Sequence, residues 1–169
     1  MHIRKETRED ERTIERIQYA AFKDHPMHAP GAEPQEPLIV SMLRADGALE
    51  VSLLAEEEGT AVGHIALSSA TVGEDAAGWF LLGPVGVLPA HQKQGIGSAL
   101  IREAIRILKL SGAAGIVLVG DPGYYGRFGF ASVDGLTWEG VPSQFVLALP
   151  LGEANPKGRI MAHAAFYTQ

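Results

Sequence analysis

The chain reads Val85-Gly86-Val87-Leu88-Pro89-Ala90-His91-Gln92-Lys93-Gln94-Gly95-Ile96-Gly97-Ser98 where an apolar strand runs into a glycine turn and the turn into a helix. A helix start leaves its first backbone amides without partners and carries a partial positive charge. Glycine lets the main chain approach an anion and adopt a positive φ at little cost. We therefore expect this turn to hold a phosphate-bearing ligand.

Three phosphate ligands fit such a turn: a dinucleotide, a nucleoside triphosphate or the pyrophosphate of coenzyme A. A Walker loop needs a lysine directly after its last glycine, and neither Gly95 nor Gly97 is followed by one. A dinucleotide fingerprint needs a third glycine where this chain has Leu100. Both patterns fail, and a plain strand-to-helix connection without a ligand remains the competing interpretation.

The segments around the turn predict an α+β fold. The clearest helix covers residues 98–110, where apolar side chains recur every three or four positions. An earlier helix is predicted over 8–22, with Glu9, Asp10, Glu15 and Arg16 facing water. Another is predicted over 35–43, with Leu38 and Met42 on its apolar face. A brief helix over 122–128 should begin at an Asp121 N-cap. Strands are predicted over 2–6, 51–57, 61–72, 80–87, 115–120, 145–151 and 159–166.

A second motif lies about thirty residues after the turn, Tyr124-Tyr125-Gly126-Arg127-Phe128-Gly129-Phe130. With Val85 to Gly97, it resembles the two hallmarks of the GNAT superfamily of N-acetyltransferases, and Gly120-Asp121-Pro122 before it suggests a bacterial branch of predicted acetyltransferases. The resemblance implies a mixed, mostly antiparallel central sheet of six to seven strands flanked by about four helices. It extends over nearly the whole chain, which we expect to be a single N-acetyltransferase domain, residues 1–169.

The resemblance also implies a cosubstrate, acetyl-CoA, and assigns residues to it. The main chain of Val85, Gly86 and Val87 is expected to pair with the pantetheine arm, and Gln92 to brace the turn. The pyrophosphate is expected to bind the backbone amides of Lys93, Gln94, Gly95, Ile96, Gly97 and Ser98. The asparagine that often precedes the family's tyrosine has no clear counterpart in this chain.

Acyl transfer to an amine needs two proton movements, because the amine must attack as the free base and the thiolate must be protonated as it leaves. Tyr125 matches the family's tyrosine near the sulfur, so its hydroxyl is the expected general acid. Tyr124 is expected to be a packing aromatic, and packing is also the alternative for Tyr125. The general base stays open among Glu33, Glu36, His28, Asp121 and ordered waters. Asp121 fits better as the N-cap, and the loop acids fit better as solvated groups.

Composition limits the remaining choices. With 169 residues the chain suits one domain. The absence of cysteine excludes an acyl-cysteine intermediate, so direct attack in a ternary complex is the simpler mechanism. A net charge of -6 argues against a nucleic-acid partner. No apolar run is long enough to cross a bilayer and the first residues are charged, so we expect a cytoplasmic protein with no membrane partner.

No metal site is expected at the histidines, and His64 and His163 are not expected to act in catalysis. His25 and His28 have metal-ligand spacing, but their proline-rich context offers no further ligands. His64 and His163 are expected to be packed or hydrogen-bonded. Arg127 is either a solvated charge or a contact to a coenzyme A phosphate.

The sequence thus predicts an enzyme that moves an acetyl group from acetyl-CoA to a primary amine of a small molecule or peptide, without a metal. A noncatalytic domain that binds or senses acyl-CoA is the alternative, since no general base is evident. The acceptor amine, the acyl chain preference and the oligomeric state are not determined, and a homodimer remains an option.

Overall fold

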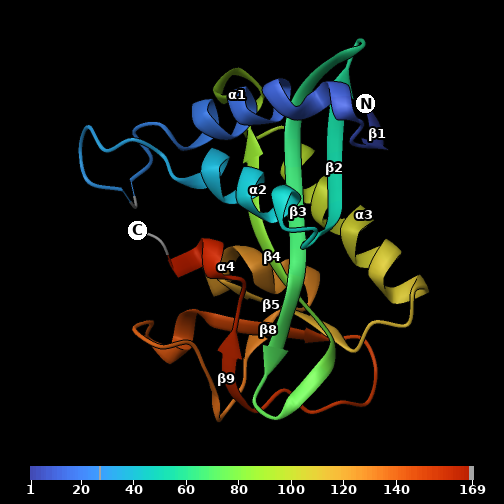
Figure 1. Ribbon diagram of the computed structural model, residues 1–169, viewed down its shortest axis with the longest axis vertical. Coiled ribbons are helices and arrows are strands. Elements are labelled where there is room, and N and C mark those ends of the chain that lie inside the picture. Colours follow the sequence, from blue (N-terminus) through green and yellow to red (C-terminus); the bar gives the residue numbers. More distant parts are fainter. Residues whose placement is uncertain (27, 168–169) are drawn as a thin grey trace. The chain divides into compact units, whose positions relative to one another are not determined.

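A computed structural model describes residues 1–26 and 28–167, with the side chains of Asp75 and Ala76 excepted (Figure 1). The chain forms two compact units. The first comprises Met1–Leu67, Gly83–Ala104 and Ala164–Gln169, and the second comprises Ser68–Leu82 and Ile105–His163. Each unit is described separately below.

The first unit contains strands β1 and β2, helices α1 and α2, and parts of three elements that continue into the second unit. Its elements are β1 (His2–Lys5), η1 (Arg8–Asp10), α1 (Glu11–Phe22), α2 (Glu36–Ala45), β2 (Leu49–Glu57), the first part of β3 (Thr60–Val72), the last part of β4 (Asp75–Val87), η2 (Pro89–His91), the start of α3 (Ile96–Leu110) and η5 (Ala164–Tyr167). The strands are hydrogen-bonded in the order β1-β2-β3-β4, and the β1–β2 pair is antiparallel.

Helices cover both faces of these strands, and two glycines allow the helices to come close. A Cβ on Gly86 would lie 2.9 Å from Ala21 Cβ of α1. A Cβ on Gly63 would lie 2.9 Å from Ile96 Cγ2 of α3. In Figure 1, α1 and α2 lie side by side in front of the strands, and the start of α3 lies behind them. Glycine is therefore required at both positions by helix packing.

Two expectations about helix faces are wrong. Asp10 is buried, not solvated, because Arg4 of β1 donates two hydrogen bonds to its carboxylate at 2.8 and 2.9 Å. Leu38 is 51% exposed, whereas Ile39 and Leu43 of α2 face the core. The helical period was right in α2, but the position of its apolar face was displaced by one residue.

The second unit contains the remaining strands. Its elements are the end of β3, the start of β4, the end of α3, β5 (Gly115–Val119), α4 (Pro122–Tyr125), η3 (Gly126–Phe128), β6 (Ala131–Ser132), β7 (Leu136–Thr137), η4 (Ser143–Phe145), β8 (Val146–Pro150) and β9 (Gly158–Met161). β5 pairs in parallel with β4 and antiparallel with β8, and β6 adds to β8. β9 pairs antiparallel with the end of β3 and in parallel with β7.

The predicted α+β fold with a mixed, mostly antiparallel sheet and four α-helices is confirmed for the described residues. Seven strands lie on the main path of the sheet, and β7 and β9 lie off it. The strand expected over 159–166 is wrong in its second half, where the chain forms the short helix η5. β6 and β7 were not predicted, because two-residue strands carry no periodicity.

None of the described helices has both the length and the apolar character needed to cross a bilayer. The prediction of a single domain over 1–169 stays a prediction.

Candidate functional site

The turn between β4 and α3 has an unusual backbone. Lys93 has φ 63° and Gly95 has φ 84°, and α3 begins at the next residue, Ile96. A positive φ is uncommon for a residue other than glycine, and such outliers concentrate at functional sites. Successive amides in a turn of this kind can form an anion-binding concavity.

The first turn of α3 leaves amides available at this position. Ala99 donates to the Gly95 carbonyl at 3.0 Å, so the amides of Ile96 and Gly97 precede the hydrogen-bonded ladder of the helix. Gln92 to Gly95 are exposed. The turn therefore offers main-chain donors to solvent at the positive end of a helix of 15 residues.

The side chain of Gln92 ties the turn to the preceding strand. Its Nε2 donates to the Val87 carbonyl at 2.9 Å. The amide of Leu88 donates to the Val62 carbonyl of β3 at 2.8 Å, which holds the end of β4 in the sheet. These contacts connect the exposed turn to the end of β4, and the end of β4 to β3.

β4 is irregular before it reaches the turn. In the second unit its parallel pairing with β5 covers three residue pairs and ends at Leu81 and Val117. Gly83 follows with φ 140°, and the Gly83–Pro84 peptide bond is cis. Since Pro84 has no amide hydrogen, it donates no ladder hydrogen bond.

Gln18 and His64 form a buried polar contact beside the last part of β4, and both are fully buried. Gln18 Nε2 lies 2.8 Å from His64 Nδ1, and 3.5 Å from the Pro84 carbonyl. Burial lowers the pKa of His64 to about 3, so the imidazole is neutral at physiological pH. The expectation that His64 is hydrogen-bonded is confirmed, but its partner Gln18 was not identified from the sequence.

Tyr125 belongs to the second unit, at the end of α4. It is half-buried, and its ring makes edge contacts with Tyr124 and Phe130 at centroid distances of 5.0 and 6.0 Å. A Cβ on Gly120 would lie 2.6 Å from Tyr125 Cε2, so glycine is needed for this ring position. Burial raises the pKa of Tyr125 to about 12, so the hydroxyl keeps its proton at neutral pH and can act as a hydrogen-bond donor.

Two neighbours of Tyr125 have local structural roles. Asp121 is the N-cap of α4, since its carboxylate accepts from the Gly123 amide at 2.9 Å, as predicted. Arg127 donates to the Tyr124 carbonyl at 2.9 Å, and its guanidinium lies 4.5 Å from the centre of the Tyr124 ring. These contacts favour the noncatalytic interpretation of Asp121.

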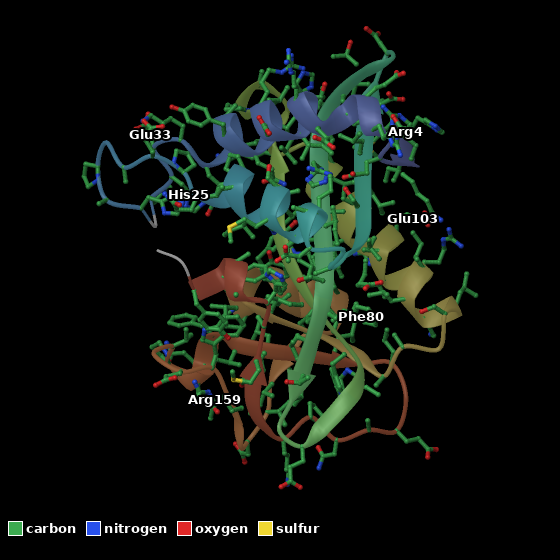
Figure 2. The ribbon with its side chains drawn as sticks, viewed as in Figure 1. Arg4, His25, Glu33, Phe80, Glu103 and Arg159 are labelled. Atoms are coloured by element: carbon green, nitrogen blue, oxygen red, sulfur yellow. The ribbon has the colours of Figure 1, made fainter. Side chains whose placement is uncertain are left out.

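The other candidate bases lie in the first unit. Figure 2 shows Glu33 on the loop after α1, where Lys23 Nζ donates to it at 2.9 Å and lowers the pKa of the carboxyl. His28 Nε2 lies 3.3 Å from a carboxylate oxygen of Glu36. Among the described residues, no group of three or more His, Asp or Glu side chains is placed to hold a metal ion.

The chain is similar to known N-acetyltransferases in sequence. A family profile described as the acetyltransferase (GNAT) family matches residues 9–130. "Uncharacterized N-acetyltransferase YjhQ" of Escherichia coli (strain K12) is 40% identical over 103 residues, which cover 59% of this chain and 57% of that protein. The match thus spans little more than half of that relative. "Uncharacterized N-acetyltransferase YhbS" of the same strain is 33% identical over 115 residues, 62% of this chain and 69% of that protein.

Solved structures are similar over nearly the whole chain. A GNAT family acetyltransferase from Brucella melitensis in complex with acetyl-CoA is 43% identical, with a TM-score of 0.83, and the match covers 98% of this chain and 97% of that one. YhbS from Escherichia coli in complex with CoA is 25% identical, with a TM-score of 0.87 and coverage of 98% and 91%.

Proposed function

The chain belongs to the acetyltransferase (GNAT) family, and from that membership we propose that it transfers an acetyl group from acetyl-CoA to a primary amine of a small molecule or peptide. One observation carries the proposal: the positive-φ residues Lys93 and Gly95 stand directly before the first turn of α3. The relatives solved with acetyl-CoA and CoA support coenzyme A as the ligand of this turn.

The turn holds the pyrophosphate in this proposal. The amides from Lys93 to Ser98 supply donors, and the helix start supplies partial positive charge. The side chain of Lys93 is not required for this binding, because the hydrogen-bond donors are main-chain amides. Gln92 keeps the turn in place through its hydrogen bond to Val87.

The last residues of β4 bind the pantetheine arm as a strand-like partner. Val85, Gly86 and Val87 present main-chain groups, and the preceding Gly83–Pro84 step leaves the ladder with β5. A main-chain amide at Val85 stabilises negative charge on the carbonyl oxygen under attack, a contribution that is typically large in acyl transfer.

The amine nitrogen adds to the acetyl carbonyl carbon, and the carbon–sulfur bond breaks when the resulting tetrahedral adduct collapses. Tyr125 donates its hydroxyl proton to the departing thiolate, the amine gives up its own proton to solvent, and Tyr125 regains a proton from solvent before the next turnover. Since the chain has no cysteine, direct transfer in a ternary complex needs no acyl-cysteine intermediate.

A turnover assay tests the proposal and separates an enzyme from a domain that only binds acyl-CoA. Purified protein is incubated with acetyl-CoA and a panel of amines, polyamines, aminoglycosides and peptide N-termini, and free thiol is measured. An enzyme releases thiol in proportion to at least one added amine. Binding of acetyl-CoA without amine-dependent thiol release from any member of the panel contradicts catalysis.

The variant Gly97→Asp tests the turn. An aspartate in the first turn of α3 is favourable for the helix but repels a diphosphate, so we expect a folded protein whose Kd for acetyl-CoA rises by at least about a hundredfold. The matched variant Gly97→Asn adds a side chain of nearly the same size without charge and should weaken binding much less. Equal Kd values for the two variants would show that the turn does not hold the diphosphate.

A further inference from the structure

A chain of hydrogen bonds runs through the first unit from α2 to β4. Arg44 donates two hydrogen bonds of 2.9 Å to Glu6, and the Ser52 hydroxyl donates to the same carboxylate. Ser52 Oγ lies 2.8 Å from His64 Nε2, and His64 Nδ1 lies 2.8 Å from Gln18 Nε2. These hydrogen bonds thus connect α2, β2, β3 and the residue after β1 to one glutamine of α1.

Every proton in this chain has a defined position. Because the Ser52 hydroxyl gives its proton to Glu6, its oxygen accepts from His64, and Nε2 of His64 therefore carries the hydrogen. His64 Nδ1 is then the acceptor for Gln18. All the donors point towards the carboxylate, and hydrogen bonds aligned in this way polarise and strengthen one another.

Gln18 is the last residue in this series of hydrogen bonds and lies beside β4. Its remaining amide hydrogen is shared between the carbonyls of His64 at 3.4 Å and Pro84 at 3.5 Å. Its oxygen, which is buried, has no hydrogen-bond partner in the described part of the chain. That oxygen faces Gly86, where an added Cβ would come within 2.7 Å of it.

We propose that Gln18 is a positioning residue, held by Glu6, Ser52 and His64, that fixes the main chain of Pro84 to Gly86 for acetyl-CoA. This inference rests on the proposed function, which places the pantetheine arm on Val85 to Val87. The fixed glutamine limits the motion of a segment in which Pro84 donates no ladder hydrogen bond. A main chain held in its binding conformation loses less entropy when ligand binds.

This series of hydrogen bonds does not conduct protons between Glu6 and the reacting amine. A glutamine amide is a donor and acceptor but not a titrating group, so it interrupts any relay from the amine to Glu6. His64 is also neutral across the working pH range, since burial lowers its pKa to about 3. The pH profile of turnover should therefore be the same with and without Gln18.

The main test is Gln18→Met, which keeps the length of the side chain and removes its hydrogen bonds. Calorimetry should show a Kd for acetyl-CoA raised about fivefold to tenfold, the scale of one or two neutral hydrogen bonds. The KM for acetyl-CoA should rise with it, with kcat and the pH profile little changed. Ile14→Val is the control, because it perturbs the same core face of α1 without touching the chain of hydrogen bonds.

Three results overturn the inference: an unchanged Kd in folded Gln18→Met, an equal rise in Ile14→Val, or nitrogen NMR shifts that place the hydrogen of His64 on Nδ1 in the wild type. If Gln18→Met does not fold, Ser52→Ala decides, since it removes the acceptor of His64 at a half-buried position. It should raise the Kd about twofold to fivefold, and no rise contradicts the inference. Wild-type protein that fails to bind acetyl-CoA contradicts the proposed function instead.

Discussion

Tyr124 and Tyr125 are adjacent in the sequence but differ in how their rings are packed. The ring of Tyr124 is covered by the guanidinium of Arg127, whereas Tyr125 is packed between Tyr124 and Phe130. Burial raises the pKa of Tyr125 to about 12. Its hydroxyl is therefore protonated at neutral pH.

Replacing Tyr125 by phenylalanine should lower kcat by about a hundredfold, the low end of the effect of a general acid, with the Kd for acetyl-CoA nearly unchanged. Steady-state kinetics and calorimetry measure the two quantities. Tyr124→Phe is the matched control and should keep most of the activity. Equal kcat values for Tyr125→Phe and Tyr124→Phe would show that the departing thiolate takes its proton from solvent and not from Tyr125.

Asp10 shows a residue whose role depends on a side chain of the preceding strand, β1. The hydrogen bonds from Arg4 hold the pKa of the Asp10 carboxyl well below its usual range, although burial opposes them, and the Thr7 amide donates to it at 2.6 Å. Figure 2 shows Arg4 at β1. Because the folded pKa is depressed, the stabilisation is complete above the unfolded pKa and is lost as the pH falls below it.

Asp10→Asn should therefore lower the free energy of unfolding by about 1–3 kcal/mol at neutral pH, measured by urea denaturation. The difference from the wild type should narrow as the pH is lowered below about 4, where the unfolded carboxyl is protonated. Glu9→Gln, at an exposed neighbouring position, should change stability by less than about 0.5 kcal/mol. If Asp10→Asn lowered the free energy of unfolding by the same amount at all pH values, the ion pair between Arg4 and Asp10 would be excluded as the cause.

At the scale of the element, α4 shows how a short helix is fixed at its start. α4 has four residues, and Asp121 supplies a side-chain acceptor for Gly123 while its carbonyl accepts from Tyr125 at 2.9 Å. So short a helix has little stability of its own, and its cap determines where Tyr125 lies.

Asp121→Ala should lower the free energy of unfolding by about 0.5–2 kcal/mol, because the Gly123 amide loses its acceptor. Asp121→Asn keeps an acceptor and should preserve both stability and turnover. Thermal unfolding and the thiol assay measure the two effects. If Asp121→Asn is as stable as the wild type but loses about a hundredfold in kcat, Asp121 is the general base after all.

At the scale of the whole molecule, ligand binding and folding are linked. Acetyl-CoA at about 100 times its Kd should raise the free energy of unfolding by about 2.7 kcal/mol, several degrees in Tm for a chain of this length. Pantetheine, which lacks the diphosphate, is the control and should give a much smaller shift. Equal shifts would contradict the role of the turn, and two separate transitions would contradict the single domain over 1–169.

Local sequence determined most of the elements and the position of the candidate turn. The periods of α1, α2 and α3 are visible in the chain, and Gly95 and Gly97 mark the turn because positive φ and close approach are properties of single residues. The start of α3 was placed two residues late, at Ser98 and not Ile96, since helix ends depend on contacts as well as on pattern. The two hallmark motifs predicted the family, and the comparisons confirm it.

Only the tertiary structure decided which polar groups are partners. Arg4 and Asp10, and Gln18 and His64, belong to different elements, and Gln18 and His64 are 46 positions apart. No sequence pattern relates such residues, because hydrogen bonding across elements depends on how helices pack on strands. Asp10 was thus expected to face water, whereas Arg4 of β1 donates to it, and Gln18 was not singled out until the packing of α1 placed it beside His64. Secondary-structure propensity and residue spacing are local properties of the sequence. Burial and the choice of hydrogen-bond partners are properties of the packed chain.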